Sequence, residues 1–280
     1  MRRAVCPIFL VLCWVDLRAD AQQIPDLNTI LMESTFKIQG PKHGDPRSIS
    51  YGTAFLMAKP KTPPSKDAWY VLVSAGHVFD DIEGDSAYIV LRDKQADGTY
   101  TSRDWKLTIR KGDTALYVKH PGADVAVVYV NMPDNFNVTI VPQSLLANDD
   151  TIRKFEIHPG DEVLCLGFPL YVSTDSGFPI LRSGRIASYP IIPTSVYKTF
   201  NFNFEIFDGN SGGPVYFIDR NRYYAGVIHM GEVVQFVIGI IKGQVGAAFY
   251  NNKTISLATV VHATYIKEAI DLLPPEPPYK

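Results

Sequence analysis

The 280-residue chain is poor in cysteine, with three in total. Two of them, Cys6 and Cys13, fall within the first 21 residues, so only Cys165 remains beyond that segment. A single cysteine cannot form an internal disulfide, which excludes a disulfide-rich scaffold and leaves the fold dependent on its packed core. Cys165 stands in the apolar run 163–166, which predicts a small buried side chain and not a reactive thiol.

The chain also lacks an excess of charge of either sign. Lysine and arginine number 27 and aspartate and glutamate 29, which gives a formal net charge of −2. Without a basic surplus, neither nucleic-acid binding nor attachment to an anionic membrane surface is expected. The six histidines are scattered, with no i,i+4 pair and no carboxylate at ligand spacing, so no metal site is expected.

The apolar run at the N-terminus is too short to span a bilayer. Residues 4–15 give about twelve positions, against the roughly twenty that a membrane helix needs. Two arginines precede the run, and Ala19-Asp20-Ala21 follows as a small-x-small cleavage site. This pattern predicts a signal peptide over 1–21 and an exported protein, secreted or periplasmic, with no stable membrane insertion after cleavage. An uncleaved anchor is the alternative.

Short apolar segments separated by turn residues make up most of the remaining chain. Twenty glycines, twenty prolines and 12% aromatic residues are typical of a turn-rich β protein. Two groups of about six strands are predicted, over 30–132 and 150–255, with a polar connector between them. They favour an all-β fold of two packed six-stranded antiparallel β-barrels. Helical spacing over 258–273 predicts a C-terminal helix, and 274–280 form a tail.

The strands are expected at particular apolar segments. The first group is predicted at 51–57, 69–74, 87–92, 105–110 and 125–130, and the second at 162–166, 180–188, 200–206, 214–218, 223–229 and 233–249. Residues 27–40 are expected to form either one strand or a short helix that covers a barrel.

The segment Gly209-Asn210-Ser211-Gly212-Gly213 frames a serine with glycines. A serine hydroxyl is a poor nucleophile at neutral pH and needs a neighbouring imidazole to take its proton. The tetrahedral intermediate then needs backbone N–H donors, and those of Gly209 and Ser211 are the candidates for this oxyanion hole. A glycine-rich turn between two strands is the structural alternative.

Two upstream segments supply the partners that such a serine needs. His77 follows an apolar strand in a turn of small residues, and Asp124 leads into the apolar run 125–128. Alone, such a histidine is more often structural, and such an aspartate often caps a turn. Together with Ser211 they stand in the order of the chymotrypsin-type serine peptidases, which predicts His77 as general base and Asp124 as acceptor of the imidazole Nδ1–H.

Over about 28–265 the chain resembles the trypsin-like serine peptidases of the S1 superfamily, and most closely the disulfide-free bacterial branch with the HtrA and glutamyl-endopeptidase groups. Besides the triad, the resemblance is carried by Gly52-Thr53-Ala54-Phe55-Leu56, Leu166-Gly167-Phe168-Pro169 and Ser183-Gly184-Arg185-Ile186. It implies a peptidase domain over 28–273 that cleaves polypeptides without a cofactor. No region that resembles a PDZ domain follows, so the full HtrA architecture is not expected.

The resemblance also bears on activation. Zymogen-activated members carry an aspartate before the nucleophile, where it pairs with a newly cut N-terminus. This chain has Asn210 at that position, which cannot form the ion pair. Activation by insertion of the N-terminus is therefore not expected.

Substrate specificity is left open by two residues with opposite implications. Glu205 falls where many members have the floor of the primary pocket, and a carboxylate there favours Lys or Arg; an exposed strand-edge position is the alternative. His229, with Gly231 nearby, falls near the strand expected to line the substrate backbone, where glutamyl endopeptidases use a histidine to select acidic side chains.

Two other functions compete with a peptidase. The motif also fits the G-x-S-x-G of α/β-hydrolases, but that fold needs a helix after the serine, and Pro214 with the β-rich run 215–218 argues against one. A peptidase fold that binds a peptide without cleaving it is the other alternative.

Overall fold

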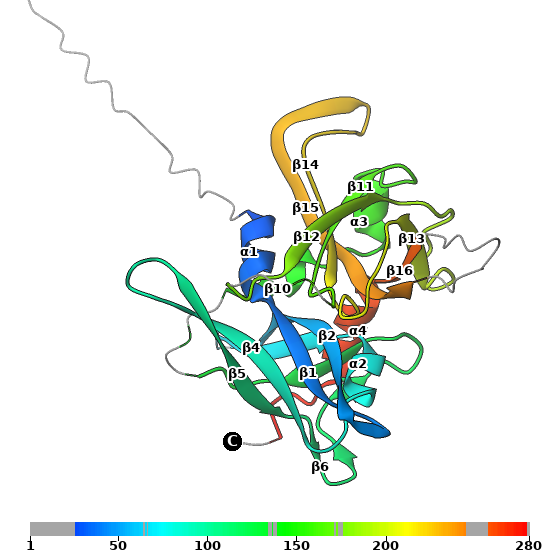
Figure 1. The fold of residues 1–280 in the computed structure, drawn as a ribbon. Helices are drawn as coiled ribbons and strands as arrows, with labels where there is room; N and C mark the ends of the chain where they lie inside the picture. The colour runs from blue at the N-terminus through cyan, green and yellow to red at the C-terminus, as the bar shows by residue number, and fades with distance from the viewer. Residues whose placement is uncertain are drawn as a thin grey trace, which may run out of the picture.

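The computed structural model describes residues 26–278 apart from 64, 66, 134, 135, 137, 138, 171, 173–175 and 245–256. The predicted signal peptide over 1–21 lies outside the described residues. Strands dominate the described chain and form two strongly curved sheets, which lie one above the other in Figure 1.

The first barrel is an eight-stranded sheet in the order β5-β4-β1-β2-β3-β9-β8, with β10 beside β2. Its strands are β1 (Thr35–Lys42), β2 (Asp45–Pro60), β3 (Ala68–Ser74), β4 (Ser86–Lys94), β5 (Tyr100–Thr108), β8 (Val118–Lys119), β9 (Ala126–Tyr129) and β10 (Val141–Pro142). Because β8 and β10 have only two residues each, six longer strands carry the barrel. A separate small hairpin joins β6 (Arg110–Lys111) to β7 (Thr114–Ala115).

The second barrel is a six-stranded sheet in the order β12-β11-β14-β15-β16-β13. Its strands are β11 (Glu162–Gly167), β12 (Ile180–Arg185), β13 (Thr199–Asn203), β14 (Pro214–Tyr224), β15 (Val227–Gln244) and β16 (Leu257–His262), all paired antiparallel. A bridge between Ile186 and Phe202 joins the end of β12 to β13 and closes the sheet. The predicted all-β fold of two barrels and a C-terminal helix is confirmed.

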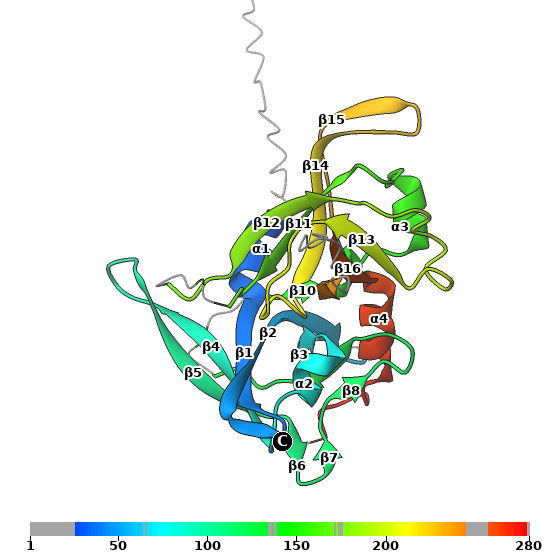
Figure 2. The same ribbon diagram turned by 45° about the vertical axis from the view of Figure 1, so that its right-hand side comes forward.

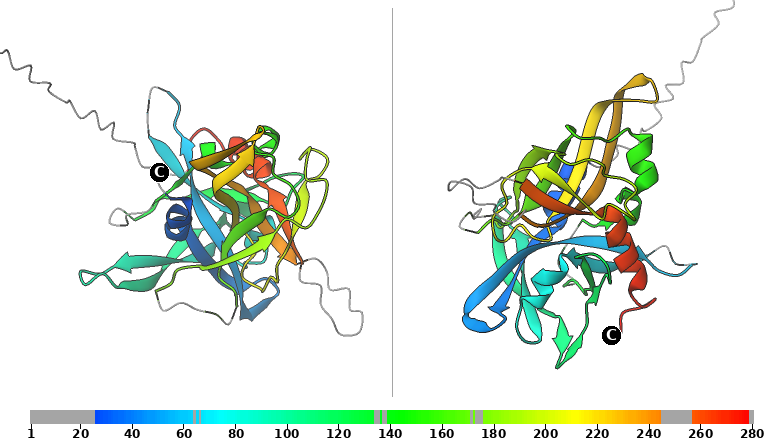
Figure 3. Two further views of the ribbon diagram at one scale, coloured as in Figure 1. Left: turned by 90° about the horizontal axis from the view of Figure 1, so that it is seen from above. Right: turned by 90° about the vertical axis from the view of Figure 1, so that its right-hand side faces the viewer.

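The helices are short and lie at the edges and ends of the barrels. They are α1 (Leu27–Ser34), α2 (Gly76–Asp80), the 3-10 turn η1 (Gln143–Leu145), α3 (Asp149–Lys154) and α4 (Ala263–Leu272). Among the helices that the structure describes, none has the length and apolar character needed to cross a bilayer. Figure 3 shows α4 alongside both barrels, and it contacts β8 and β9 of the first and β15 and β16 of the second.

Two boundaries differ from those predicted. The expected helix over 258–273 begins only at Ala263, because the preceding residues form β16 between β13 and β15. The β-branched Thr259, Val260 and Val261 fit a pleated strand better than a helix turn. Residues 27–40 form both of the expected alternatives, α1 followed by most of β1.

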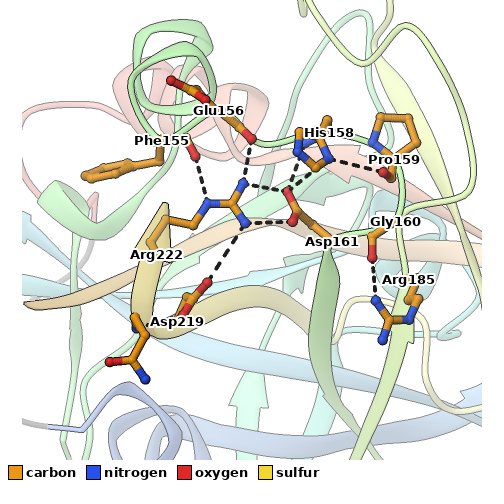
Figure 4. Close-up of polar contacts among 10 residues, drawn as sticks. Phe155, Glu156, His158, Pro159, Gly160, Asp161, Arg185, Asp219 and Arg222 are labelled. Carbon is orange, nitrogen blue, oxygen red and sulfur yellow. Dashed lines mark hydrogen bonds and ion pairs between the residues drawn. The ribbon is translucent and has the colours of Figure 1, made fainter. Parts of the chain in front are cut away.

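A long hairpin formed by β14 and β15 projects beyond the second barrel (Figures 1 and 2). Its two strands replace the three that were predicted at 214–218, 223–229 and 233–249. Its tip is a two-residue turn in which Ala225 and Gly226 both have positive φ, the geometry that suits the twist of a tight hairpin. Figure 4 shows that Arg222 joins β14 of this hairpin to the segment between α3 and β11, through Asp161 and the carbonyl of Phe155.

The two barrels share part of one hydrophobic core. Leu166, Tyr216 and Val237 of the second barrel are fully buried in the same cluster as the core of the first. The side chains of α4 join that cluster, with Ile266 and Ile270 fully buried. A second cluster, rich in phenylalanine, fills the interior of the second barrel. This shared core holds the segments from the two barrels that form the candidate site at their junction.

Candidate active site

The turn after β3 brings His77 against Asp124. His77 Nδ1 lies 2.7 Å from Asp124 Oδ2, and the backbone N–H of His77 donates to Asp124 Oδ1 at 3.0 Å. A Cβ atom on Gly76 would lie 3.0 Å from Asp124 Oδ1, so a glycine permits this close approach. Because the ionised carboxylate accepts from Nδ1–H, Nε2 is left as the basic nitrogen of the neutral ring.

Electrostatics favour a charged Asp124 and a basic His77. The hydrogen bond to Asp124 raises the pKa of His77; burial opposes this, and the charges of Asp124, Asp81 and Asp80 add to it. For Asp124 burial acts to raise the pKa, but the hydrogen bonds and charge of His77, with the charge of Lys242, outweigh it and lower the pKa. A negative Asp124 stabilises the imidazolium that forms when His77 takes a proton.

Ser211 lies at the junction, in the turn that leads into β14. Its carbonyl accepts from Thr53 N of the first barrel at 2.8 Å. A Cβ atom on Gly212 would lie 2.2 Å from both Ser74 Oγ and Thr53 O, so only a glycine lets the serine turn lie against the end of β3. The structure thus brings the Ser211 segment to the strand end that carries His77.

The hydroxyl of Ser211 points toward β15. Ser211 Oγ donates to the carbonyl of Lys242 at 3.3 Å, and in the described part of the chain no hydrogen bond joins it to His77. A change of χ1 rotamer is enough to redirect a serine hydroxyl. Catalytic hydrogen bonds are often poorly aligned before substrate binds and become shorter in the complex.

The turn before the serine has all of its carbonyls occupied. Phe207 O accepts from Asn210 N at 3.1 Å, Asp208 O from Leu170 N at 2.7 Å, and Gly209 O from Thr53 Oγ1 at 2.6 Å. Within the described residues, the N–H groups of Gly209 and Ser211 have no such partner. Because N–H and C=O point in opposite directions across a trans peptide, carbonyls directed into the protein turn the N–H of Gly209 outward, as an oxyanion donor requires.

Asn210 stabilises this turn from within the protein. It is 2% exposed, and its side-chain amide donates to Phe207 O at 3.0 Å. A Cβ atom on Gly167 would lie 2.3 Å from Asn210 Oδ1, so the carboxamide also packs closely against β11. The side chain of Asn210 therefore stabilises the turn through a neutral internal hydrogen bond.

His229 and Gly231 lie on the distal part of the long hairpin, which corrects the prediction that they line the substrate. His229 pairs across the hairpin with Arg222, and its ring stacks on Tyr224 at 3.8 Å between centroids. Pro214, near the serine, is eight residues from Arg222 along β14, which is roughly 26 Å of extended strand. The position was misjudged because β15 is one uninterrupted strand of 18 residues.

The part of β15 that lies beside the serine is nearer its C-terminal end. Gly212 N donates to Ile241 O at 2.8 Å, and Lys242 O accepts from Ser211. Sequence reasoning did not identify these residues, although Gly239, two residues before Ile241, is a glycine within a strand and marks a close approach of the neighbouring backbone at Val261 O.

Glu205 is exposed on the segment between β13 and the turn over 207–211, between the buried Phe204 and Ile206. Its assignment to a specificity pocket stays a prediction. A separate cavity of about 410 Å³ is lined by Tyr51 of the first barrel and by Phe168 and Leu170, which follow β11 of the second.

The described residues contain no group of three His, Cys, Asp or Glu side chains arranged to hold a metal ion. Cys165 is buried, and burial raises the pKa of its thiol to about 12. The thiol is therefore protonated and unreactive at neutral pH.

Comparison with known proteins agrees with this architecture. No family model and no curated protein matches the sequence. Among solved structures, the chain is similar to the protease Anisep from Arthrobacter nicotinovorans, with 15% identity and a TM-score of 0.50 over 86% of this chain and 94% of that one. It is also similar to the Rv3671c protease from M. tuberculosis in its active form, with 16% identity and a TM-score of 0.50 over 91% and 86%. At such identities the likeness shows the fold alone, which is that of the chymotrypsin-like serine proteases.

Proposed function

We propose that this protein is a serine endopeptidase that hydrolyses peptide bonds through His77, Asp124 and Ser211. The observation that carries the proposal is the turn over 207–211, whose carbonyls are all hydrogen-bonded inward while the N–H groups of Gly209 and Ser211 have no acceptor among the described residues. A turn with a purely structural role would not be expected to leave two N–H groups unpaired beside a His–Asp pair.

The chemistry follows from the roles of these groups. Ser211 Oγ attacks the carbonyl carbon of the substrate while His77 Nε2 takes the hydroxyl proton, and Asp124 stabilises the imidazolium. The N–H groups of Gly209 and Ser211 donate to the oxyanion of the tetrahedral intermediate. His77 then gives its proton to the leaving amine, the C–N bond breaks, and the acyl group stays on Ser211. Water, deprotonated by His77, releases the acid and restores the serine.

The decisive experiment is labelling with a fluorophosphonate, combined with cleavage of a peptide library. We expect the wild type to be labelled at Ser211, and Ser211→Ala to lose labelling and roughly 10⁶-fold in kcat, because no other group can form the acyl intermediate. Ser65→Ala, at an exposed loop serine, is the matched control and should behave as wild type.

An unlabelled wild type that binds peptides without cleaving them would instead support the non-catalytic alternative. The esterase alternative is weakened by the strand β14, which begins three residues after Ser211 at the place where a hydrolase has a helix.

We further propose that the protein is exported and that residues 1–21 are a cleaved signal peptide. Support comes from the sequence, in which two arginines, a run of about twelve apolar residues and a small-x-small site follow one another. We also propose that the protein belongs to the disulfide-free bacterial branch of the trypsin-like serine peptidases. Support comes from the sequence segments 52–56, 166–169 and 183–186, which resemble that branch.

A further inference from the structure

Thr53, in β2 of the first barrel, is fully buried at the junction of the two barrels. Its N–H, carbonyl and hydroxyl groups each form a hydrogen bond with a segment that is distant in the sequence. Its N–H donates to Ser211 O at 2.8 Å, and its carbonyl accepts from Ser74 Oγ at 2.7 Å. One residue thus connects the turn of the nucleophile with the strand that leads to His77.

The hydroxyl of Thr53 makes two further bonds, both to the second barrel. It donates to Gly209 O at 2.6 Å and accepts from Phe168 N at 3.2 Å. A threonine hydroxyl has a single proton to donate, so Gly209 O receives the only donor hydrogen that this side chain has.

Both peptide groups that flank Gly209 depend on these bonds. The peptide after Gly209 is held directly, through its carbonyl on Thr53 Oγ1. The peptide before Gly209 is held by a hydrogen bond from Leu170 N to Asp208 O. Leu170 lies two residues after Phe168, whose N–H donates to the same Thr53 hydroxyl. Phe168 is also in close contact with the turn, because a Cβ atom on Gly209 would lie 2.2 Å from Phe168 O.

Loss of this hydroxyl would leave the buried carbonyl of Gly209 and the partly buried N–H of Phe168 without a partner, which proteins avoid. The turn can relieve this only by rotating its peptide groups. If the peptide between Asp208 and Gly209 rotates, a carbonyl replaces the N–H at the oxyanion position and the bond to Leu170 is lost. The hydroxyl therefore favours the conformation in which the turn donates.

We propose that Thr53 is a positioning residue for catalysis, whose hydroxyl holds the oxyanion turn in its donating conformation and couples it to the first barrel. This role rests on the proposed function, because an oxyanion turn matters only if Ser211 forms a tetrahedral intermediate. Thr53 itself contacts neither the substrate nor the reacting atoms.

The test compares Thr53→Val, which keeps the shape and removes the hydroxyl, with Thr53→Ser, which keeps the hydroxyl. Loss of a whole oxyanion donor costs about 10²–10³ in kcat, so a misplaced one in Thr53→Val should cost about 10- to 100-fold, with KM changed less than about threefold. Thr53→Ser should lie within about threefold of wild type. Rates are normalised by active-site titration, so that only folded enzyme is counted.

Thr35→Val is the matched control. Thr35 is also fully buried in the first barrel, but its hydroxyl has no hydrogen-bond partner in the part of the chain that the structure describes. The same chemical change there should leave kcat unaltered.

A second readout separates positioning from a general loss of structure. A peptide aldehyde forms a tetrahedral adduct whose oxygen occupies the oxyanion hole, whereas a peptide with the scissile carbonyl reduced to methylene binds without it. In Thr53→Val the affinity for the aldehyde should fall in parallel with kcat/KM, while the affinity for the reduced peptide stays the same. A merely structural role would weaken both or neither.

The proposal would be overturned if Thr53→Val had the same kcat and the same aldehyde affinity as the wild type. It would also be overturned if the kcat of Thr53→Ser were no higher than that of Thr53→Val. If Thr53→Val does not fold, Thr53→Ala is measured in the same way, and the same outcomes decide. A wild type that is never labelled at Ser211 would refute the proposed function; an active wild type with an equally active Thr53→Val would refute only the role of Thr53.

Discussion

At the scale of single residues, the candidate site depends on glycines, because their lack of a Cβ atom lets two backbones approach closely. Gly209 lies against the carbonyl of Phe168 and Gly212 against Thr53 and Ser74, and in each case a Cβ atom would come within 2.2 Å of an oxygen. Both glycines also have positive φ, a region that other residues rarely adopt. Close approach of two backbones is thus what brings the serine of one barrel to the histidine of the other.

The His77–Asp124 pair makes a prediction about pH. Because the hydrogen bond to Asp124 raises the pKa of His77 above 6.5, and the neutral ring is the base, kcat/KM should fall as the pH drops through a value above 6.5. In Asp124→Asn this acid limb should move to lower pH and kcat should fall about 10⁴-fold. A profile of kcat/KM between about pH 5 and 9 measures both.

The control for this prediction is another histidine–carboxylate pair. His120 Nε2 lies 2.9 Å from Glu268 Oε2 of α4. Glu268→Gln should leave the acid limb of kcat/KM where it is in the wild type. An acid limb that shifts equally in both variants would mean that His77 is not the group observed.

At the scale of elements, the β14–β15 hairpin is supported by one buried arginine. Arg222 is 8% exposed and makes two bonds to Asp161, at 2.6 and 2.8 Å (Figure 4). It also donates to the carbonyl of Phe155 at 2.9 Å. These bonds attach the hairpin to the segment between α3 and β11, which thereby supports a strand pair that extends beyond its barrel.

Removal of this arginine should destabilise the fold while leaving catalysis intact. Arg222→Ala removes the ion pair of Asp161, whose side chain is only 11% exposed and keeps the N–H of His158 as a donor. Loss of such a largely buried ion pair costs about 3 kcal/mol in the free energy of unfolding. Arg220→Ala is the control: that side chain is 63% exposed and 3.9 Å from Asp26, so we expect a change within about 0.5 kcal/mol. Urea unfolding measures both. Equal stabilities would show that the Arg222 network is dispensable, and a lower kcat in folded Arg222→Ala would contradict the distance between hairpin and site.

At the scale of the whole molecule, α4 and the shared core join the two barrels, and His262 lies at the start of this helix. His262 is 1% exposed, and neither ring nitrogen has a hydrogen-bond partner among the described residues. Burial lowers its pKa from 6.5 to about 4, although the charge of Asp149 and the nearby backbone of Ile191 act in the opposite direction. The folded protein therefore holds this histidine uncharged.

Stability should consequently fall in mild acid. Between pH 6.5 and about 4 the unfolded chain binds a proton at His262 that the folded chain does not, so the free energy of unfolding decreases as the pH falls through this window. The full effect is on the order of 3 kcal/mol. His262→Leu should lose this part of the pH dependence, measured by urea unfolding at several pH values, whereas His43→Leu, at an exposed histidine, should retain it. An unchanged dependence in His262→Leu would contradict the prediction.

Some features were predictable because their signals are local. The triad candidates lie in short segments of recognisable chemistry, and strands follow from apolar runs between turn residues. The helix start was misplaced because pairing with β13 and β15 overrides the helical spacing of residues 258–262. His229 was misplaced because a count along the chain cannot tell which part of an 18-residue strand faces the serine.

By itself, the sequence determined the fold class and the order of His77, Asp124 and Ser211, because periodicity and motif chemistry act over a few residues. Only the tertiary structure decided how the turn over 207–211 is held. The hydroxyl of Thr53 reaches partners 115 and 156 residues away in the chain, Phe168 and Gly209. Hydrogen bonds at that separation form only when two barrels pack against each other, so no local pattern can reveal them.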